Sequence, residues 1–153
     1  MPHIHEKIDF TVEVFIVYKD KVLLRMHDKF KIWLSVGGHI ELDEDPVQAA
    51  IREVKEEVGL DIKIHGEVPV FNHENYSYLP APKYLGKHLV NENHTHVVLV
   101  YFATSDTDKI SNSESEHERT ETKWVTKEEL ADLNLRPNVF HLATEALKEL
   151  GNK

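Results

Sequence analysis

The sequence predicts a single α/β domain over residues 1–153, with a mixed β-sheet lying between helices. The first observation behind this prediction is the order of the elements, in which groups of β-branched, apolar segments are separated by helical ones. That order is typical of a sheet covered on both faces. The second is size, because 153 residues, of which 41% are hydrophobic, can bury a core within one domain.

The N-terminal part of the chain predicts two paired strands. Residues 10–26 are β-branched and apolar except at the polar residues 19–21, so we expect a hairpin that turns there. The segment that follows leads into Gly37 and Gly38. Two consecutive glycines predict a flexible loop at this point.

The clearest helix pattern covers residues 46–58. Asp45 is a favourable N-cap, Pro46 suits the first helical position, and Gln48 completes a capping-box pattern. Gly59 follows at the position where a left-handed residue ends many helices. These signals predict both ends of the helix.

The rest of the chain alternates between strands, loops and helices. We expect, in order, a strand over 60–71, a long loop over 72–93, a buried strand over 94–104, an acidic loop over 106–121, a short strand over 122–126, a short helix over 127–133 and an amphipathic helix from Arg136. A loop as long as residues 72–93 is usually functional or disordered in a compact domain.

The charge of the chain limits its partners. It carries 27 acidic and 18 basic side chains, which gives a formal net charge of −9. This charge argues against binding to nucleic-acid backbones or anionic membranes, which attract basic surfaces. It does not argue against a small phosphorylated ligand, because a divalent cation reverses the local charge.

Cysteine content and the N-terminal pattern bear on chemistry and location. The chain has no cysteine, which excludes disulfides, thiolate catalysis and sulfur-ligated zinc. No signal-peptide pattern opens the sequence, and no apolar segment approaches the roughly 20 residues of a membrane span. We therefore expect a cytoplasmic protein, either a monomer or a homodimer.

Eleven histidines are scattered along the chain without a compact ligand spacing. In extended segments, His3 and His5 would share one face, as would His94 and His96. We interpret both pairs as surface or supporting residues rather than as a metal site, because exposed histidine is common.

The helix over residues 46–58 separates into two faces at about 100° per residue. One face is apolar and is expected to dock on the sheet. The other gathers Glu53, Glu56 and Glu57 near the C-terminus, where the carboxylates repel one another and oppose the helix dipole. Hard oxygen donors gathered in this way suit Mg²⁺ or Mn²⁺, which would turn the repulsion into attraction. A solvated charged face is the alternative interpretation.

The residues around this helix also fit a longer pattern, GX₅EX₇REUXEEXGU, in which U is a bulky aliphatic residue. The matching residues are Gly38, Glu44, Arg52, Glu53, Val54, Glu56, Glu57, Gly59 and Leu60. The sequence thus resembles the Nudix hydrolases over a box of 23 residues, 38–60. The order of the flanking strands is similar to the α/β/α sandwich of that family.

The resemblance implies hydrolysis of a nucleoside diphosphate linked to another group, with water attacking a phosphorus atom. It implies that Glu53, Glu56 and Glu57 bind the divalent cation, together with a backbone carbonyl at Gly38. It further implies that Glu53 or Glu56 helps to deprotonate the water. Such a cation neutralises phosphate charge and lowers the pKa of bound water.

The resemblance gives Glu44 and Arg52 a supporting part in catalysis, since they would orient the metal-binding carboxylates. A purely structural ion pair is the alternative. Many family members use a further glutamate a few residues before a tryptophan. Residues 114–121 hold four glutamates ahead of Trp124, and we predict Glu118 as a metal ligand, with Glu121 the next candidate and solvated loop charge the alternative.

Substrate residues are predicted outside the box. Arg25 is a candidate for phosphate binding, and Tyr76 or Tyr78 for stacking on a base, an interaction worth about 1–3 kcal/mol. Ordinary surface roles are the alternative for all three. Tyr76 and Tyr78 lie where diadenosine polyphosphate hydrolases of the family tend to carry a tyrosine.

The activity predicted first is that of a MutT-like nucleoside triphosphate pyrophosphohydrolase. A diadenosine polyphosphate or nucleotide-sugar hydrolase is the alternative within the family. A Nudix-like sensor that binds nucleotides without turnover is the alternative from a different functional class, although the box glutamates are all present.

Overall fold

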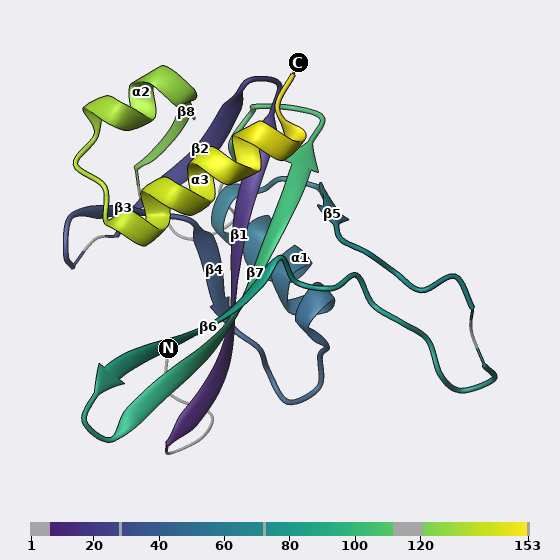
Figure 1. The fold of residues 1–153 in the computed structure, drawn as a ribbon. Helices are drawn as coiled ribbons and strands as arrows, with labels where there is room; N and C mark the ends of the chain where they lie inside the picture. The colour runs from purple at the N-terminus through teal and green to yellow at the C-terminus, as the bar shows by residue number, and fades with distance from the viewer. Residues whose placement is uncertain (1–6, 28, 72, 112–120, 153) are drawn as a thin grey trace.

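Two long strands, β1 (Ile8–Tyr18) and β7 (His94–Ser105), lie at the centre of the fold (Figure 1). This computed structural model describes residues 7–27, 29–71, 73–111 and 121–152. The two strands run parallel, with Asp9 beside His96 at one end and Val17 beside Thr104 at the other. Both are rich in β-branched and aromatic residues, which suit a pleated, buried surface.

Further strands extend this pair into a mixed sheet, which has eight strands within the described residues. On one side of β1 lie β2 (Lys21–His27) and β4 (Val36–His39), both antiparallel to it. Strand β2 pairs in turn with β3 (Ile32–Leu34) and β8 (Thr122–Thr126). On the far side, β7 pairs antiparallel with β5 (Ile62–His65) and β6 (Tyr84–Asn91).

Helices cover both faces of this sheet (Figure 1). Helix α1 (Pro46–Val58) packs on one face, while α2 (Lys127–Asp132) and α3 (Pro137–Leu150) lie on the other. The alternation of side chains along β1 supplies both cores, because Val14 faces α1 whereas Phe15 and Val17 face α3. The predicted α/β sandwich with a mixed sheet between helices is therefore confirmed.

Helix α1 has the predicted bounds because the local signals act as expected. The Asp45 side chain accepts from the Gln48 amide, the Gln48 side chain accepts from the Asp45 amide, and Gly59 ends the helix at φ 70°. The strands around residues 94–105 and 122–126 and the helix beginning at Pro137 also lie where the sequence places them.

Two predictions about loops were wrong, and one strand was predicted too long. Residues 84–91, predicted as part of a loop, form β6, an edge strand with exposed side chains on both faces and hence without apolar alternation. The predicted strand over 60–71 is confined to Ile62–His65. Gly37 and Gly38 lie in β4 rather than in a flexible loop, because they pair with Glu13 and Val12 of β1.

Candidate functional site

The carboxylate site is built on α1 and on the segment that leads into it. Val54 and Val58 are buried against the sheet, which fixes the rotation of the helix about its own axis. That rotation directs Glu57 toward β2 and Glu53 toward β4. The packing of the apolar face therefore decides where the glutamates lie.

Arg52 joins the residues of the site. Its Nε and Nη2 donate to Glu44 Oε2 and Oε1 at 2.9 and 2.6 Å. Its Nη1 donates to Glu53 Oε1 at 3.0 Å and to Glu56 Oε2 at 3.2 Å, and its Nη2 donates to the carbonyl of His39 at 3.0 Å. The hydrogen bonds from Arg52 to Glu44 lower the pKa of Glu44. Paired geometry of this kind is among the stronger interactions of arginine.

Glu53 is buried between α1 and β4, with only 4% of the residue exposed. A Cβ on Gly38 would lie 2.3 Å from Glu53 Oε1, so only glycine leaves room for the carboxylate. Burial raises the pKa of Glu53, although Arg52 opposes the shift. Because Gly38 has no side chain, the Glu53 carboxylate can lie close to the backbone of the strand, which is a known reason for glycine within a strand.

Glu57 lies on the side toward β2, with 11% of its side chain exposed. Burial raises the pKa of Glu57 to about 8. Arg25 Nη1, 3.3 Å from Glu57 Oε2, opposes that shift, as does a hydrogen bond to the backbone of Gly37. The carboxyl of Glu57 also shares a hydrogen bond with that of Glu53. Two acidic groups in contact and out of water need either a proton or a cation between them.

Glu56 differs from its neighbours in exposure. About half of its side chain, 49%, is open to solvent, and its Oε2 is oriented by Arg52. The site therefore presents two buried carboxylates and one accessible carboxylate on one side of a helix.

These residues fit a hard divalent cation. Glu53, Glu56 and Glu57 supply oxygen donors only, which Mg²⁺ and Mn²⁺ prefer. The raised pKa values of Glu53 and Glu57 reflect the cost of ionising them in this buried position, a cost that a cation would offset. The part predicted for the Gly38 carbonyl in metal binding stays a prediction.

The structure places the other predicted residues in different ways. Arg25 lies at the glutamates, paired with Glu57. Tyr76 and Tyr78 lie in the segment between β5 and β6, where their rings contact each other at a centroid distance of 5.1 Å and Tyr78 contacts Phe71 at 5.9 Å. Glu118 lies outside the described residues.

A second cluster of ionisable groups was not predicted as such. His94, interpreted from the sequence as a surface or supporting residue, is 4% exposed, and its Nε2 lies 3.3 Å from Oδ2 of the buried Asp9. His96 and His39 pack beside it. The spacing of His94 and His96, two residues apart on one strand, was the sequence signal for this cluster. Their partner Asp9 lies 85 residues earlier on a different strand, so the sequence did not reveal it.

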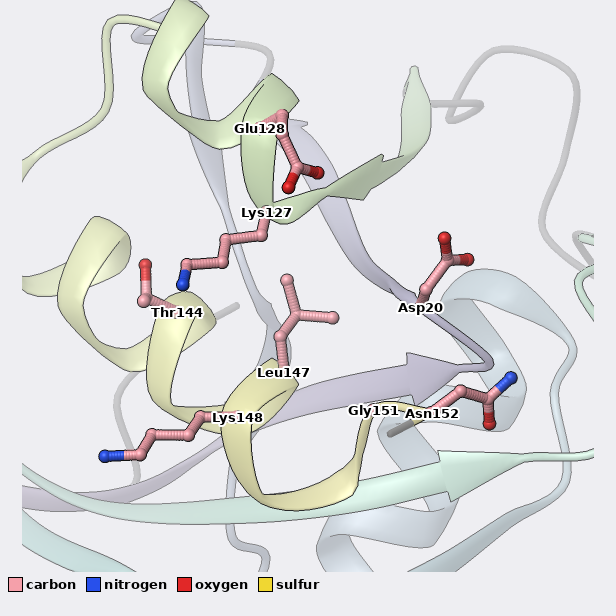
Figure 2. A pocket seen from close by; sticks show the side chains of 8 residues that line it. All are labelled: Asp20, Lys127, Glu128, Thr144, Leu147, Lys148, Gly151 and Asn152. Atoms are coloured by element: carbon pink, nitrogen blue, oxygen red, sulfur yellow. The ribbon is translucent and has the colours of Figure 1, made fainter.

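A pocket of about 320 Å³ (Figure 2) is lined by residues of neither group. It is bounded by the turn between β1 and β2, the start of α2 and the end of α3, with Asp20, Lys127 and Lys148 among its lining residues. Its charges are of both signs, so they favour no particular ligand. The described glutamates of the box do not line it.

The chain has a glutamate-rich helix packed on a mixed sheet, and the carboxylates of this helix lie against the two glycines of β4. This arrangement is that of a Nudix-type domain. A family model described as the NUDIX domain matches residues 9–145. The chain belongs to the Nudix family.

Relatives agree with this assignment. A solved structure of a NUDIX-family hydrolase from Clostridium perfringens is 39% identical, with a TM-score of 0.81, and the match covers 93% of this chain and 97% of that one. The dihydroneopterin triphosphate diphosphatase of Haemophilus influenzae is 36% identical, over 51% of this chain and 58% of that protein. The enzyme of the same name from Escherichia coli K12 is 35% identical, over 41% and 49%.

The chain spans about half the length of the curated relatives that it matches, at 58% and 49% of their lengths. Among the residues that the structure describes, no helix is both long and apolar enough to cross a membrane.

Proposed function

We propose that this chain hydrolyses a phosphoanhydride bond in a nucleoside diphosphate linked to another group, in a reaction that depends on Mg²⁺ or Mn²⁺. The observation that carries the proposal is the grouping of three glutamates, in which Glu53 and Glu56 accept from Arg52 and Glu57 lies against Glu53 and Arg25. A sensor would not need one exposed carboxylate next to two buried ones, whereas a hydrolase needs both cation ligands and a group that reaches water.

The residues of the site have separate tasks in this proposal. Glu53 and Glu57 hold the cation from the buried side, and Glu56 completes the set from the solvent side. The bound cation supplies charge neutralisation for the phosphates and lowers the pKa of water. Glu53 or Glu56 accepts the proton of the attacking water, while Arg52, held by Glu44, fixes both carboxylates.

A triphosphate is the substrate class that we propose first. Cleavage between its α- and β-phosphates releases a monophosphate and pyrophosphate. The names of two bacterial relatives support a triphosphate and add dihydroneopterin triphosphate to the candidates. Arg25 lies at the glutamates, where a phosphate would be held, and Tyr76 and Tyr78 are exposed for stacking on a ring.

The experiment is a product assay on the purified chain with Mg²⁺ and with EDTA. The panel contains the common and oxidised nucleoside triphosphates, dihydroneopterin triphosphate, a diadenosine polyphosphate and a nucleotide sugar. Pyrophosphate and monophosphate as products would support the first proposal. Products of the last two substrates only would assign the chain to the alternative hydrolase class.

The control variants separate catalysis from folding. Glu57→Gln should abolish turnover, whereas Glu92→Gln, which changes an exposed glutamate in the β6–β7 turn, should leave turnover unchanged. Equal rates with Mg²⁺ and EDTA would refute the metal-dependent mechanism. Absence of turnover, combined with a nucleotide-induced rise in Tm, would support the sensor instead.

A further inference from the structure

A group of histidines surrounds a buried aspartate on the face of the sheet opposite α1. Asp9 and His96 are neighbours on the parallel strands β1 and β7, and His94 shares the face of His96 because it lies two residues earlier. Figure 1 shows this end of β1, β6 and β7 projecting beyond α3. The group is therefore separate from the carboxylates of α1, which lie on the other face.

The donor atoms of the group lie close together. One ligand atom from each of Asp9, His94 and His96 lies within 4.8 Å of the other two. His94 Nε2 and Asp9 Oδ2 are 3.3 Å apart. Neighbouring ligands of a tetrahedral zinc ion, with bonds of about 2.0–2.2 Å, lie roughly 3.3–3.5 Å from each other. One pair already has this spacing, and a cation would draw the third donor inward.

A positively charged partner would stabilise the buried carboxylate of Asp9. Asp9 is 1% exposed and His94 4% exposed, and an ionised carboxylate in such a position requires a charged or strongly polar partner. His96 is less buried than either and is partly exposed. Imidazole rings alone supply a positive charge only when protonated, whereas a divalent cation supplies it with neutral imidazoles.

We propose that Asp9, His94 and His96 form a transition-metal site that takes Zn²⁺, distinct from the Mg²⁺ or Mn²⁺ site of α1. Two imidazole nitrogens and one carboxylate oxygen suit Zn²⁺, while the oxygen-only donors of α1 suit harder cations. Three protein ligands leave a fourth position for water. The metal would join β1 to β7 at the end of the sheet that α3 does not cover.

The carbonyl and ring of His39 connect the two faces. Its carbonyl accepts from Arg52, within the glutamate site, while its ring packs against His96 at a centroid distance of 4.9 Å. Its Nε2 lies 3.6 Å from Asp9 Oδ2. Zinc at Asp9 would therefore also order the end of β4 behind the glutamate site.

The test is zinc binding by the tag-free, metal-stripped chain in excess Mg²⁺, which keeps the oxygen site filled. Calorimetry should give one Zn²⁺ per chain, and zinc should raise the Tm. His96→Ala and Asp9→Asn should each weaken binding at least about tenfold, the scale of losses seen when even supporting residues of a metal site are changed. His73→Ala, which removes an exposed histidine from the segment between β5 and β6, should bind zinc as the wild type does.

Two further variants distinguish this site from other donors. Glu57→Gln should keep its zinc affinity, because Glu57 belongs to the other face. A His3→Ala/His5→Ala double variant should also keep it. Loss of binding in either of these, with retention in His96→Ala, would overturn the proposal.

Zinc-edge X-ray absorption of the wild type provides a test that does not depend on the folding of any variant. The spectrum should contain the scattering of two imidazole rings bound to zinc. Oxygen-only coordination, or the absence of stoichiometric zinc binding, would show that the histidines merely hydrogen-bond Asp9 and would refute the site.

Discussion

Arg52 is the residue on which the geometry of the glutamate site depends most directly. It donates to Glu44, Glu53 and Glu56, so Arg52→Gln leaves the part-buried acceptors of Glu44 and Glu53 without their charged donor. We expect a loss of about 1.5–3 kcal/mol in the free energy of unfolding, the range for hydrogen bonds to charged groups. Urea unfolding measures the change. Lys55→Gln, a change on the same helix, breaks an exposed ion pair with Asp61, which lies beyond the helix C-terminus. This variant should cost less than about 1 kcal/mol, and an equal loss in both variants would contradict this account.

A substitution at Gly38 tests the position of the Glu53 carboxylate without changing the charge of the site. In Gly38→Ala the new Cβ would meet the end of the Glu53 side chain, which can move while the backbone stays in place. We expect a folded protein whose kcat is roughly a hundredfold lower, because displacement of about 1 Å has that effect on catalysis. Steady-state kinetics and far-UV circular dichroism measure the two properties. Gly86→Ala, where a Cβ meets only Val98 at 4.0 Å, is the matched strand control, and normal kcat in Gly38→Ala would disprove the close-approach argument.

Glu57 gives the metal-free protein a defined dependence on pH. Burial raises the pKa of Glu57 to about 8 from the ordinary 4.5, so between these values the folded chain holds a proton that the unfolded chain has lost. The free energy of unfolding therefore falls as pH rises through this window. Urea unfolding in EDTA at several pH values should show the fall. Glu57→Gln should flatten it without removing it, because burial raises the pKa values of Glu13 and Glu53 in the same direction; an unchanged slope would exclude Glu57 as its source.

At the scale of the element, α1 depends on its N-terminal cap for the position of the glutamates. Asp45→Ala removes the acceptor of the Gln48 amide and one half of the capping box. We expect a cost of about 0.5–2 kcal/mol in the free energy of unfolding. Asp43→Ala, two residues earlier and exposed, should cost little. Thermal or urea unfolding compares the two variants, and similar losses in both would mean that the cap is not the cause.

The elements that the sequence predicted well are those specified by local chemistry. Helix α1 has a cap, an N-terminal proline and a C-terminal glycine within 15 residues, so its bounds matched. Strand β6 was missed because it is an exposed edge strand, held by backbone pairing with β7 rather than by an apolar face. The strand position of Gly37 and Gly38 was missed for the same reason, since pairing with β1 is a long-range property.

The site shows the same division between local and long-range information. The grouping of Glu53, Glu56 and Glu57 follows from helical periodicity. The contact of Arg52 with Glu44 is also local, because only eight residues separate them along the chain. The contact of Arg25 with Glu57 and the approach of Gly38 to Glu53 join different strands to the helix. The register of β1 against β7 brings Asp9 to the histidines, and no local pattern specifies that register.

At the scale of the whole molecule, one sheet supports two cores, and this should couple the stability of both faces. β1 contributes Val14 to the core under α1 and Phe15 to the core under α3. A cation bound on the α1 face therefore stabilises the same strand that carries the opposite core. At a hundred times its Kd, a ligand adds about 2.7 kcal/mol to the free energy of unfolding, and this gain should apply to both layers.

The two tryptophans of the chain provide the measurement, because Trp33 packs on the α3 side and Trp124 on the α1 side. Trp124→Phe leaves Trp33 as the reporter of one core, and Trp33→Phe leaves Trp124 for the other. In each variant the urea midpoint from fluorescence should equal that from far-UV circular dichroism, as a single cooperative transition requires. Mg²⁺ should raise all four midpoints. A midpoint for Trp33 that stays fixed while that of Trp124 rises would mean that the faces unfold independently, and that β1 does not transmit the stabilisation from the glutamate site to the opposite core.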